Sequence, residues 1–136
     1  MMLSAMNKTS PIQVTEYTFT GYPVTDMARA RGFYEGLLNL KETTAFEHEG
    51  KAWVEYDVGG ATRAISNMQT EQWKPSSDGP AMAFEVVDFE GAVATLKEAG
   101  VKFFMEPFDS GVGQMGILSD PDGNTVLIHN RKAQQG

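Results

Sequence analysis

The stretches PVTDMARARGFYEGLL, residues 23–38, and AFEVVDFEGAVATLKEAG, residues 83–100, decide the fold. Each begins with strand-type residues, passes through a V-x-D step and continues with the spacing of a helix. Asp26 and Asp88 are natural N-caps, because a carboxylate at that position accepts the free amide hydrogens of the first helical turn. They lie 62 residues apart (88 minus 26). The sequence therefore predicts two copies of one structural unit.

Strand patterns complete both copies. The first has a strand at residues 15–24, its helix, and then three short strands in LKETTAFEHEG, KAWVEYDVGG and ATRAISNM. The second has PAMAFEVV, its helix, and then VKFFMEPF, GQMGILSD and NTVLIHNR. Each copy reads βαβββ, which predicts an α+β fold. The expected organisation is a tail (1–12), module one (13–67), a linker (68–79), module two (80–131) and a C-terminal tail (132–136).

Composition narrows the possible partners. The 136 residues suffice for one domain with its own core. The net charge is -7 and no Lys/Arg run is present, so nucleic acid and anionic membranes are not expected partners. The chain has no cysteine, which removes disulfides and thiolate sites. No apolar run approaches the length of a signal peptide core or a membrane span. We expect a cytoplasmic protein.

The two helix-bearing stretches, followed by SDPDGN at 119–124, resemble the glyoxalase/bleomycin resistance protein/extradiol dioxygenase group, the vicinal oxygen chelate superfamily. The resemblance covers residues 15–131. It implies that eight strands curl into a cupped mixed sheet with the helices outside. It also implies that two chains pair side by side, so a homodimer is expected.

Metal-using relatives take His, Glu or Gln ligands from the first and fourth strands of each module. The resemblance places these positions at Phe19 and Ala64 in module one and at Ala81 and Leu127 in module two. None of these side chains can donate a lone pair to a metal. We therefore expect no metal and no cofactor, with the cup kept as an apolar container.

Strand parity adds further candidates for the inside of the cup. Counting by twos from the ligand positions selects Tyr17, Ala83, Glu85, Thr125 and His129. Glu85 and His129 are then either a carboxylate–imidazole pair that polarises a ligand, transfers protons or forms a displaced metal pair, or two solvated residues at strand ends.

Module one offers an aromatic candidate. If Val54 and Tyr56 meet the helix, Trp53 and Glu55 face the cup, where Trp53 either stacks on a flat ligand or only packs. The segment GVGQMG at 111–116 matches a nucleotide-binding pattern but lacks the strand–loop–helix context. Its glycines are expected to shape a strand entry and leave Gln114 or Met115 near the mouth of the cup.

Two main functions follow from these residues. The first is a small-molecule-binding protein that encloses an apolar or aromatic ligand, as bleomycin-sequestering relatives do without catalysis. The alternative is a lyase or dioxygenase-type enzyme that uses displaced ligands such as Glu85, His129 and Glu55, or metal-free acid/base chemistry. A structural or regulatory protein with an empty cup is the third possibility.

Overall fold

The computed structural model describes residues 10, 11, 13, 15–68 and 71–132. Most of the two predicted tails lies outside these residues. Both modules have the predicted order of elements. Module one contains β1 (Thr20–Pro23), α2 (Met27–Arg31), η1 (Gly32–Leu37), β2 (Glu42–His48), β3 (Lys51–Val58) and β4 (Ala61–Ser66). Module two contains β5 (Met82–Glu85), α3 (Phe89–Glu98), β6 (Phe108–Asp109), β7 (Gly113–Ser119) and β8 (Thr125–Arg131).

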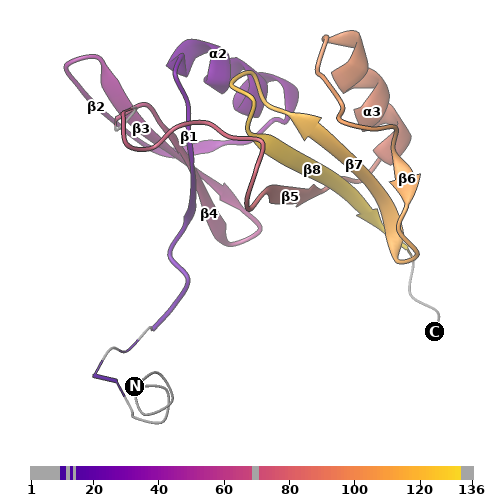
Figure 1. Cartoon of the computed structure of the whole chain (residues 1–136), viewed down its shortest axis with the longest axis horizontal. Coiled ribbons are helices and arrows are strands. Elements are labelled where there is room, and N and C mark those ends of the chain that lie inside the picture. The colour runs from indigo at the N-terminus through magenta and orange to yellow at the C-terminus, as the bar shows by residue number, and fades with distance from the viewer. Residues whose placement is uncertain (1–9, 12, 14, 69–70, 133–136) are drawn as a thin grey trace.

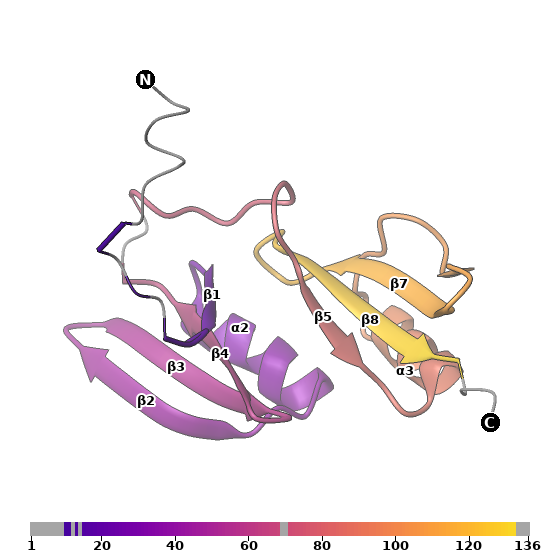
Figure 2. The ribbon, with the colours of Figure 1, turned by 90° about the horizontal axis from the view of Figure 1, so that it is seen from below.

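The eight strands form two four-stranded mixed sheets. Their strand orders are β1-β4-β3-β2 and β5-β8-β7-β6, and in each sheet the first strand pairs in parallel with the last strand of its module. Both helices lie on the same side of the sheets (Figure 1), and the view from below looks onto the opposite side (Figure 2). The predicted α+β fold of two βαβββ modules is confirmed.

Both predicted N-caps are present. The side chain of Asp26 accepts a hydrogen bond from the backbone N–H of Arg29, and that of Asp88 accepts one from the backbone N–H of Gly91, each at 3.0 Å. α3 is followed by Gly100, whose φ of 86° is a left-handed conformation that glycine adopts without a steric penalty. No helix in the part of the chain that the structure describes is long and apolar enough to cross a bilayer.

The predicted strand at 101–108 is mostly absent. Phe103 forms an isolated bridge with Leu118, and regular pairing resumes only in the two residues of β6. Between them lies Pro107, which has no N–H to contribute to a ladder. The chain therefore touches the edge of β7 twice without forming one continuous strand.

One hydrophobic core serves both modules. It lies between the helices and the sheets, and its fully buried members from module one include Val24, Tyr34 and Val54, with Leu118 and Ile128 from module two. Burial of such side chains stabilises each by about 1.5–3 kcal/mol relative to exposure. The modules therefore share their main source of stability.

Hydrogen bonds from β1 also cross the module junction. The hydroxyl group of Tyr22 donates to the carbonyl oxygen of Thr125 at 2.5 Å and accepts the backbone N–H of Met82. The side-chain amide of Asn124 donates to the carbonyl oxygen of Pro23 at 2.8 Å. These contacts fix the edge of one sheet against the start of the other.

Candidate functional site

The side of each sheet away from the helices carries the predicted site residues. In β3, Val54 and Tyr56 are buried at 0% and 1% exposure, which places Trp53 and Glu55 on the opposite side. In module two, Met82, Phe84, Val126 and Ile128 are buried, so the residues between them face away from the helices. We call this side the helix-free face. Its predicted members are Phe19, Trp53, Glu55, Ala64, Ala81, Ala83, Glu85, Met115, Leu127 and His129.

An aromatic cluster occupies the module-one part of this face. The rings of Phe19 and Trp53 meet edge to face, with centroids 5.1 Å apart and planes at 82°. Trp73 packs over Gly21, since a Cβ atom built there would lie 3.2 Å from Cη2 of Trp73 and 3.6 Å from Cε1 of Phe19. Phe19 keeps 41% of its surface exposed. We call Phe19, Trp53 and Trp73 the aromatic cluster.

Trp73 was not predicted as a site residue, because it lies in residues 68–79, a segment whose composition is that of a polar linker. Its signal was a single large aromatic residue within an otherwise polar segment. Ala64, by contrast, was expected to face a ligand but is fully buried. It pairs with Gly21 and Glu55 across the sheet. Tyr17, just before β1, is 73% exposed and bonds the hydroxyl group of Thr20.

Glu55 is already engaged by the aromatic cluster. Its Oε2 accepts a hydrogen bond of 2.8 Å from the indole Nε1–H of Trp53. This bond satisfies the only donor of the indole and fixes the orientation of its ring. Glu55 therefore acts here as a support for Trp53.

A carboxylate–imidazole pair lies in the other sheet. Glu85 and His129 are partners in the β5–β8 ladder, and Oε1 of Glu85 is 2.8 Å from Nδ1 of His129. Oε2 of Glu85 accepts the backbone N–H of Arg131. The hydrogen bond with His129, followed by that from Arg131, lowers the pKa of Glu85 below its ordinary value. The pairing that the sequence suggested for Glu85 and His129 is present.

Gln114 and Met115, predicted as alternatives for the mouth of the cup, lie on opposite sides of β7. Met115 is the cross-strand partner of His129 on the helix-free face. Gln114 borders a cavity with Phe89 and Val93 of α3. Gln114 is therefore not among the side chains of the helix-free face.

The side chains at the family's metal positions do not fit a metal. Phe19, Ala81 and Leu127 present a ring, a methyl group and an isobutyl group, and Ala64 is buried. Within residues 10–132, apart from the undescribed positions, no three His, Asp or Glu side chains gather as a metal site would require.

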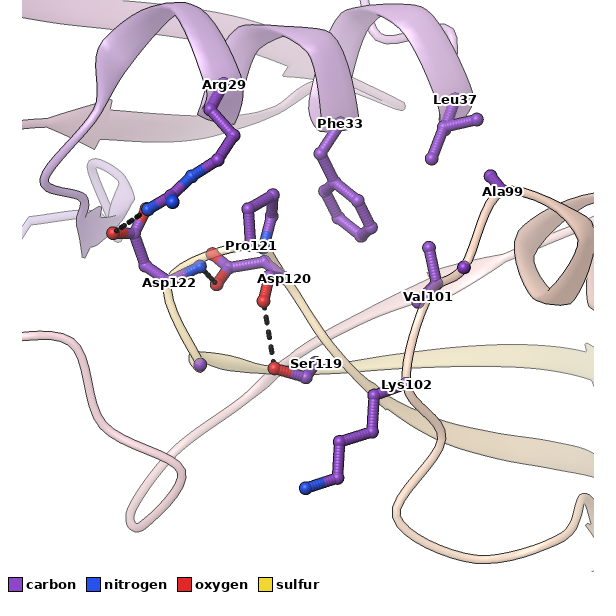
Figure 3. Close-up of a pocket in the computed structure, with 12 residues that line it drawn as sticks. Arg29, Phe33, Leu37, Ala99, Val101, Lys102, Ser119, Asp120, Pro121 and Asp122 are labelled. Atoms are coloured by element: carbon purple, nitrogen blue, oxygen red, sulfur yellow. Dashed lines mark hydrogen bonds and ion pairs between the residues drawn. The ribbon is translucent and has the colours of Figure 1, made fainter.

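A cavity of about 640 Å³ lies on the other side of the molecule, between α2, the segment after α3 and the SDPDG turn (Figure 3). Nη2 of Arg29 forms an ion pair with Oδ1 of Asp122 at 3.0 Å, and the same oxygen accepts the backbone N–H of Thr25. Next to it, the buried carboxylate of Asp120 accepts the hydroxyl hydrogen of Tyr34 at 2.8 Å. The carboxylates of Asp120 and Asp122 therefore connect module two to module one through Tyr34, Thr25 and Arg29. We interpret this cavity as part of the junction between the modules.

A family of known proteins matches this chain. The family model described as Glyoxalase/Bleomycin resistance protein/Dioxygenase superfamily matches residues 16–128. A search among curated proteins finds no significant match.

Solved structures share the fold at low sequence identity. TnmS3, an antibiotic binding protein from Streptomyces sp. CB03234, is 20% identical, with 89% of this chain and 99% of that chain covered at a TM-score of 0.67. The fosfomycin resistance protein FosX from Listeria monocytogenes is 14% identical, with coverages of 88% and 96% and a TM-score of 0.72. A glyoxalase family protein from Enterococcus faecalis is 18% identical, with coverages of 85% and 97% and a TM-score of 0.64. Since the family match spans most of the chain and both βαβββ modules are present, this protein belongs to the glyoxalase/bleomycin resistance protein/dioxygenase superfamily.

Proposed function

We propose that the protein binds a small apolar or aromatic molecule on its helix-free face, without the metal that many members of the superfamily use. The observation that carries this proposal is the aromatic cluster, which places partly exposed rings at a position where metal-using relatives have a ligand. Rings of this kind bind flat ligands by stacking and by apolar burial. The similarity in fold to an antibiotic binding protein supports a binding role.

Neighbouring residues hold the rings of the aromatic cluster in position before any ligand binds. Glu55 orients Trp53 through the indole hydrogen bond, and Gly21 leaves room for Trp73 to approach the sheet. A ring that is already oriented loses less conformational freedom when a ligand binds. The connector that carries Trp73 is held to module two by the bonds from Ser76 N–H to Asn124 and from the Thr125 hydroxyl to Ser77.

The chain provides its own optical probe for this site. Its two tryptophans are Trp53 and Trp73, and both belong to the aromatic cluster. We expect a neutral flat arene such as naphthalene to quench their fluorescence in a saturable titration. Phe19→Ala should weaken binding by about tenfold, which corresponds to roughly 1.4 kcal/mol.

Phe104→Ala is the matched control, because Phe104 is equally exposed at 42% but lies in module two. It should leave the titration unchanged. Saturable binding of naphthalene that is the same in the wild type and in Phe19→Ala would contradict the proposed site, and so would the absence of quenching.

The alternative with displaced metal ligands receives less support. Glu55 bonds Trp53 in one sheet, whereas Glu85 and His129 lie in the other. A homodimer and a cytoplasmic location also remain proposals. The dimer is supported by the open helix-free face and is tested by its mass in solution, and cell fractionation tests the location.

A further inference from the structure

The pair of Glu85 and His129 has the arrangement of an oriented base. The carboxylate is fixed twice, by Nδ1 of His129 at 2.8 Å and by the backbone N–H of Arg131. The imidazole side chain is 15% exposed and the carboxylate side chain 44%. A carboxylate held in this way sets the orientation of the ring that it contacts.

The contact also fixes which nitrogen carries the proton. An ionised carboxylate only accepts hydrogen bonds, so Nδ1 of a neutral His129 must be the protonated nitrogen. The lone pair then resides on Nε2. Nε2 has no hydrogen-bond partner among the residues that the structure describes, and it is not sealed from solvent.

Gly113 allows the His129 ring to lie close to the backbone of β7. A Cβ atom built on Gly113 would lie 2.8 Å from Nε2 and 2.9 Å from Cε1 of His129. Only a residue without a side chain lets the imidazole approach the backbone of β7 this closely. The position of Nε2 is therefore set by both neighbouring strands.

The surroundings of the pair on the same face are apolar. Met115 is directly opposite His129 on β7, and Ala83 and Leu127 form the next cross-strand row. The charged groups at this end of the sheet are Glu85, Arg131 and the ion pair of Lys132 with Asp109 at 3.4 Å. A base next to an apolar surface fits a ligand with an apolar body and one acidic proton.

We propose that the Glu85–His129 pair is a proton-accepting site for an arene that carries an acidic hydroxyl group. The ring of the ligand packs on Leu127, Ala83 and Met115, its O–H bond breaks, and the proton moves to Nε2 of His129. The resulting phenolate lies beside an imidazolium whose other nitrogen donates to Glu85. This site lies in module two and does not depend on the aromatic cluster of the proposed function.

Among acidic groups, a phenol has the acidity that suits proton transfer to the Glu85–His129 pair. A carboxylic acid is already ionised at neutral pH and would be repelled by Glu85. An aliphatic alcohol is too weak an acid to give its proton to imidazole. An acidic phenol has an acidity close to that of imidazolium, and its ring contacts the Met115 sulfur favourably.

The test uses 4-nitrophenol, whose phenolate absorbs visible light, at neutral pH, which lies above the ordinary pKa of imidazolium. We expect the wild-type protein to raise the phenolate absorbance in a saturable titration. His129→Gln should abolish the rise, and Glu85→Gln should reduce the affinity for phenolate by about tenfold or more. Nitrobenzene, which has no proton to give, should bind wild type and His129→Gln equally.

His48 is the matched control, since the chain has two histidines and each has a glutamate beside it. His48 is 69% exposed, and its Nε2 is 3.7 Å from Oε2 of Glu49. His48→Gln should leave the phenolate signal unchanged. Imidazole ¹⁵N spectra should show His129 as the Nδ1–H tautomer at neutral pH.

Three results would overturn the proposal. They are a phenolate signal that persists in His129→Gln, an Nε2–H tautomer in the wild type, and no response of His129 to 4-nitrophenol up to the solubility of the probe. Because naphthalene quenching reports on Trp53 and Trp73 in module one, each site can fail without the other.

Discussion

At the scale of single residues, Asp120 joins the two modules through one buried carboxylate. It is 3% exposed and accepts hydrogen bonds from the hydroxyl of Tyr34 and from the backbone N–H groups of Asp122 and Asn124. Burial and the adjacent Asp120 carboxylate raise the pKa of Tyr34 well above its ordinary value. The phenol therefore remains a donor throughout the neutral range.

Asp120→Ala is expected to lower the free energy of unfolding by about 2–4 kcal/mol, because several buried donors lose their acceptor at once. Urea denaturation measures the change. Asp57→Ala is the control, since Asp57 is exposed and caps only the turn at Gly60, and it should cost about 1 kcal/mol or less. Equal effects of the two substitutions would show that Asp120 does not hold the junction.

Gly113 gives a second residue-scale prediction. Its added Cβ would lie 2.4 Å from the carbonyl oxygen of Asn130 and 2.8 Å from Nε2 of His129. Gly113→Ala must therefore shift backbone or imidazole, and we expect a loss of about 1–3 kcal/mol in urea denaturation. Gly32→Ala is the matched control, because nothing lies within 4 Å of a Cβ there and its φ of -58° is helical. A neutral Gly113→Ala would mean that β7 and β8 are not packed this closely.

Some site residues were predictable because strand parity depends only on counting. Val54 and Tyr56 face the core and Trp53 faces away, as alternation requires. Trp73 was not predictable, because its place over Gly21 depends on the path of an irregular connector. Of the two alternatives Gln114 and Met115, alternation along β7 puts only Met115 on the same face as His129, because neighbouring residues of a strand point to opposite sides.

At the scale of elements, N-cap residues predicted where the helices begin. The sequence did not predict the irregular elements, which are the π-helical η1 and the interrupted strand at 101–108. The caps at Asp26 and Asp88 were readable from their positions before apolar runs. The first helix, however, is α-helical only over α2 and continues as the π-helical η1. Such a change of helical winding has no strong sequence signal. The strand predicted at 101–108 is interrupted before β6, because Pro107 has no N–H with which to pair.

The end of the β5–β8 ladder should be sensitive to acid. The folded-state pKa of Glu85 lies below its ordinary value, so the pair adds stability above the unfolded-state pKa. That contribution is lost as the pH falls through the folded-state pKa. We expect the drop in unfolding free energy between neutral pH and about pH 3 to be smaller in Glu85→Gln than in the wild type. Glu98→Gln, at the exposed end of α3, is the matched control, and identical acid profiles for the wild type and Glu85→Gln would contradict this assignment.

At the scale of the whole molecule, exposed edges and faces favour assembly of two chains. Every residue of β2 is exposed, and Phe46 in this outer strand is 56% exposed. An unpaired strand edge beside apolar side chains is a surface that a second copy can cover. We expect light scattering to give about twice the chain mass of 14.9 kDa at tens of micromolar. A mass near that of one chain at this concentration would contradict the dimer.

The last prediction concerns metal binding by the whole protein. Transition-metal sites in proteins need several converging donors, and Phe19, Ala64, Ala81 and Leu127 supply none. Glu85 and His129 supply two at most, and their hydrogen bond already occupies one nitrogen. We therefore expect thermal melts to stay unchanged with zinc, nickel, manganese or iron.

A site occupied at a hundred times its dissociation constant would add about 2.7 kcal/mol and raise the melting temperature by several degrees. The combined variant Phe19→His, Ala81→His and Leu127→Glu restores donor types of the superfamily and serves as the positive control, because a metal-dependent melt in this variant shows that the assay detects binding. One equivalent of metal that survives dialysis of the wild type, and is lost in Glu85→Ala or His129→Ala, would refute the metal-free proposal. Such a result would favour an enzyme with displaced ligands, because a retained metal with an open position polarises a bound substrate.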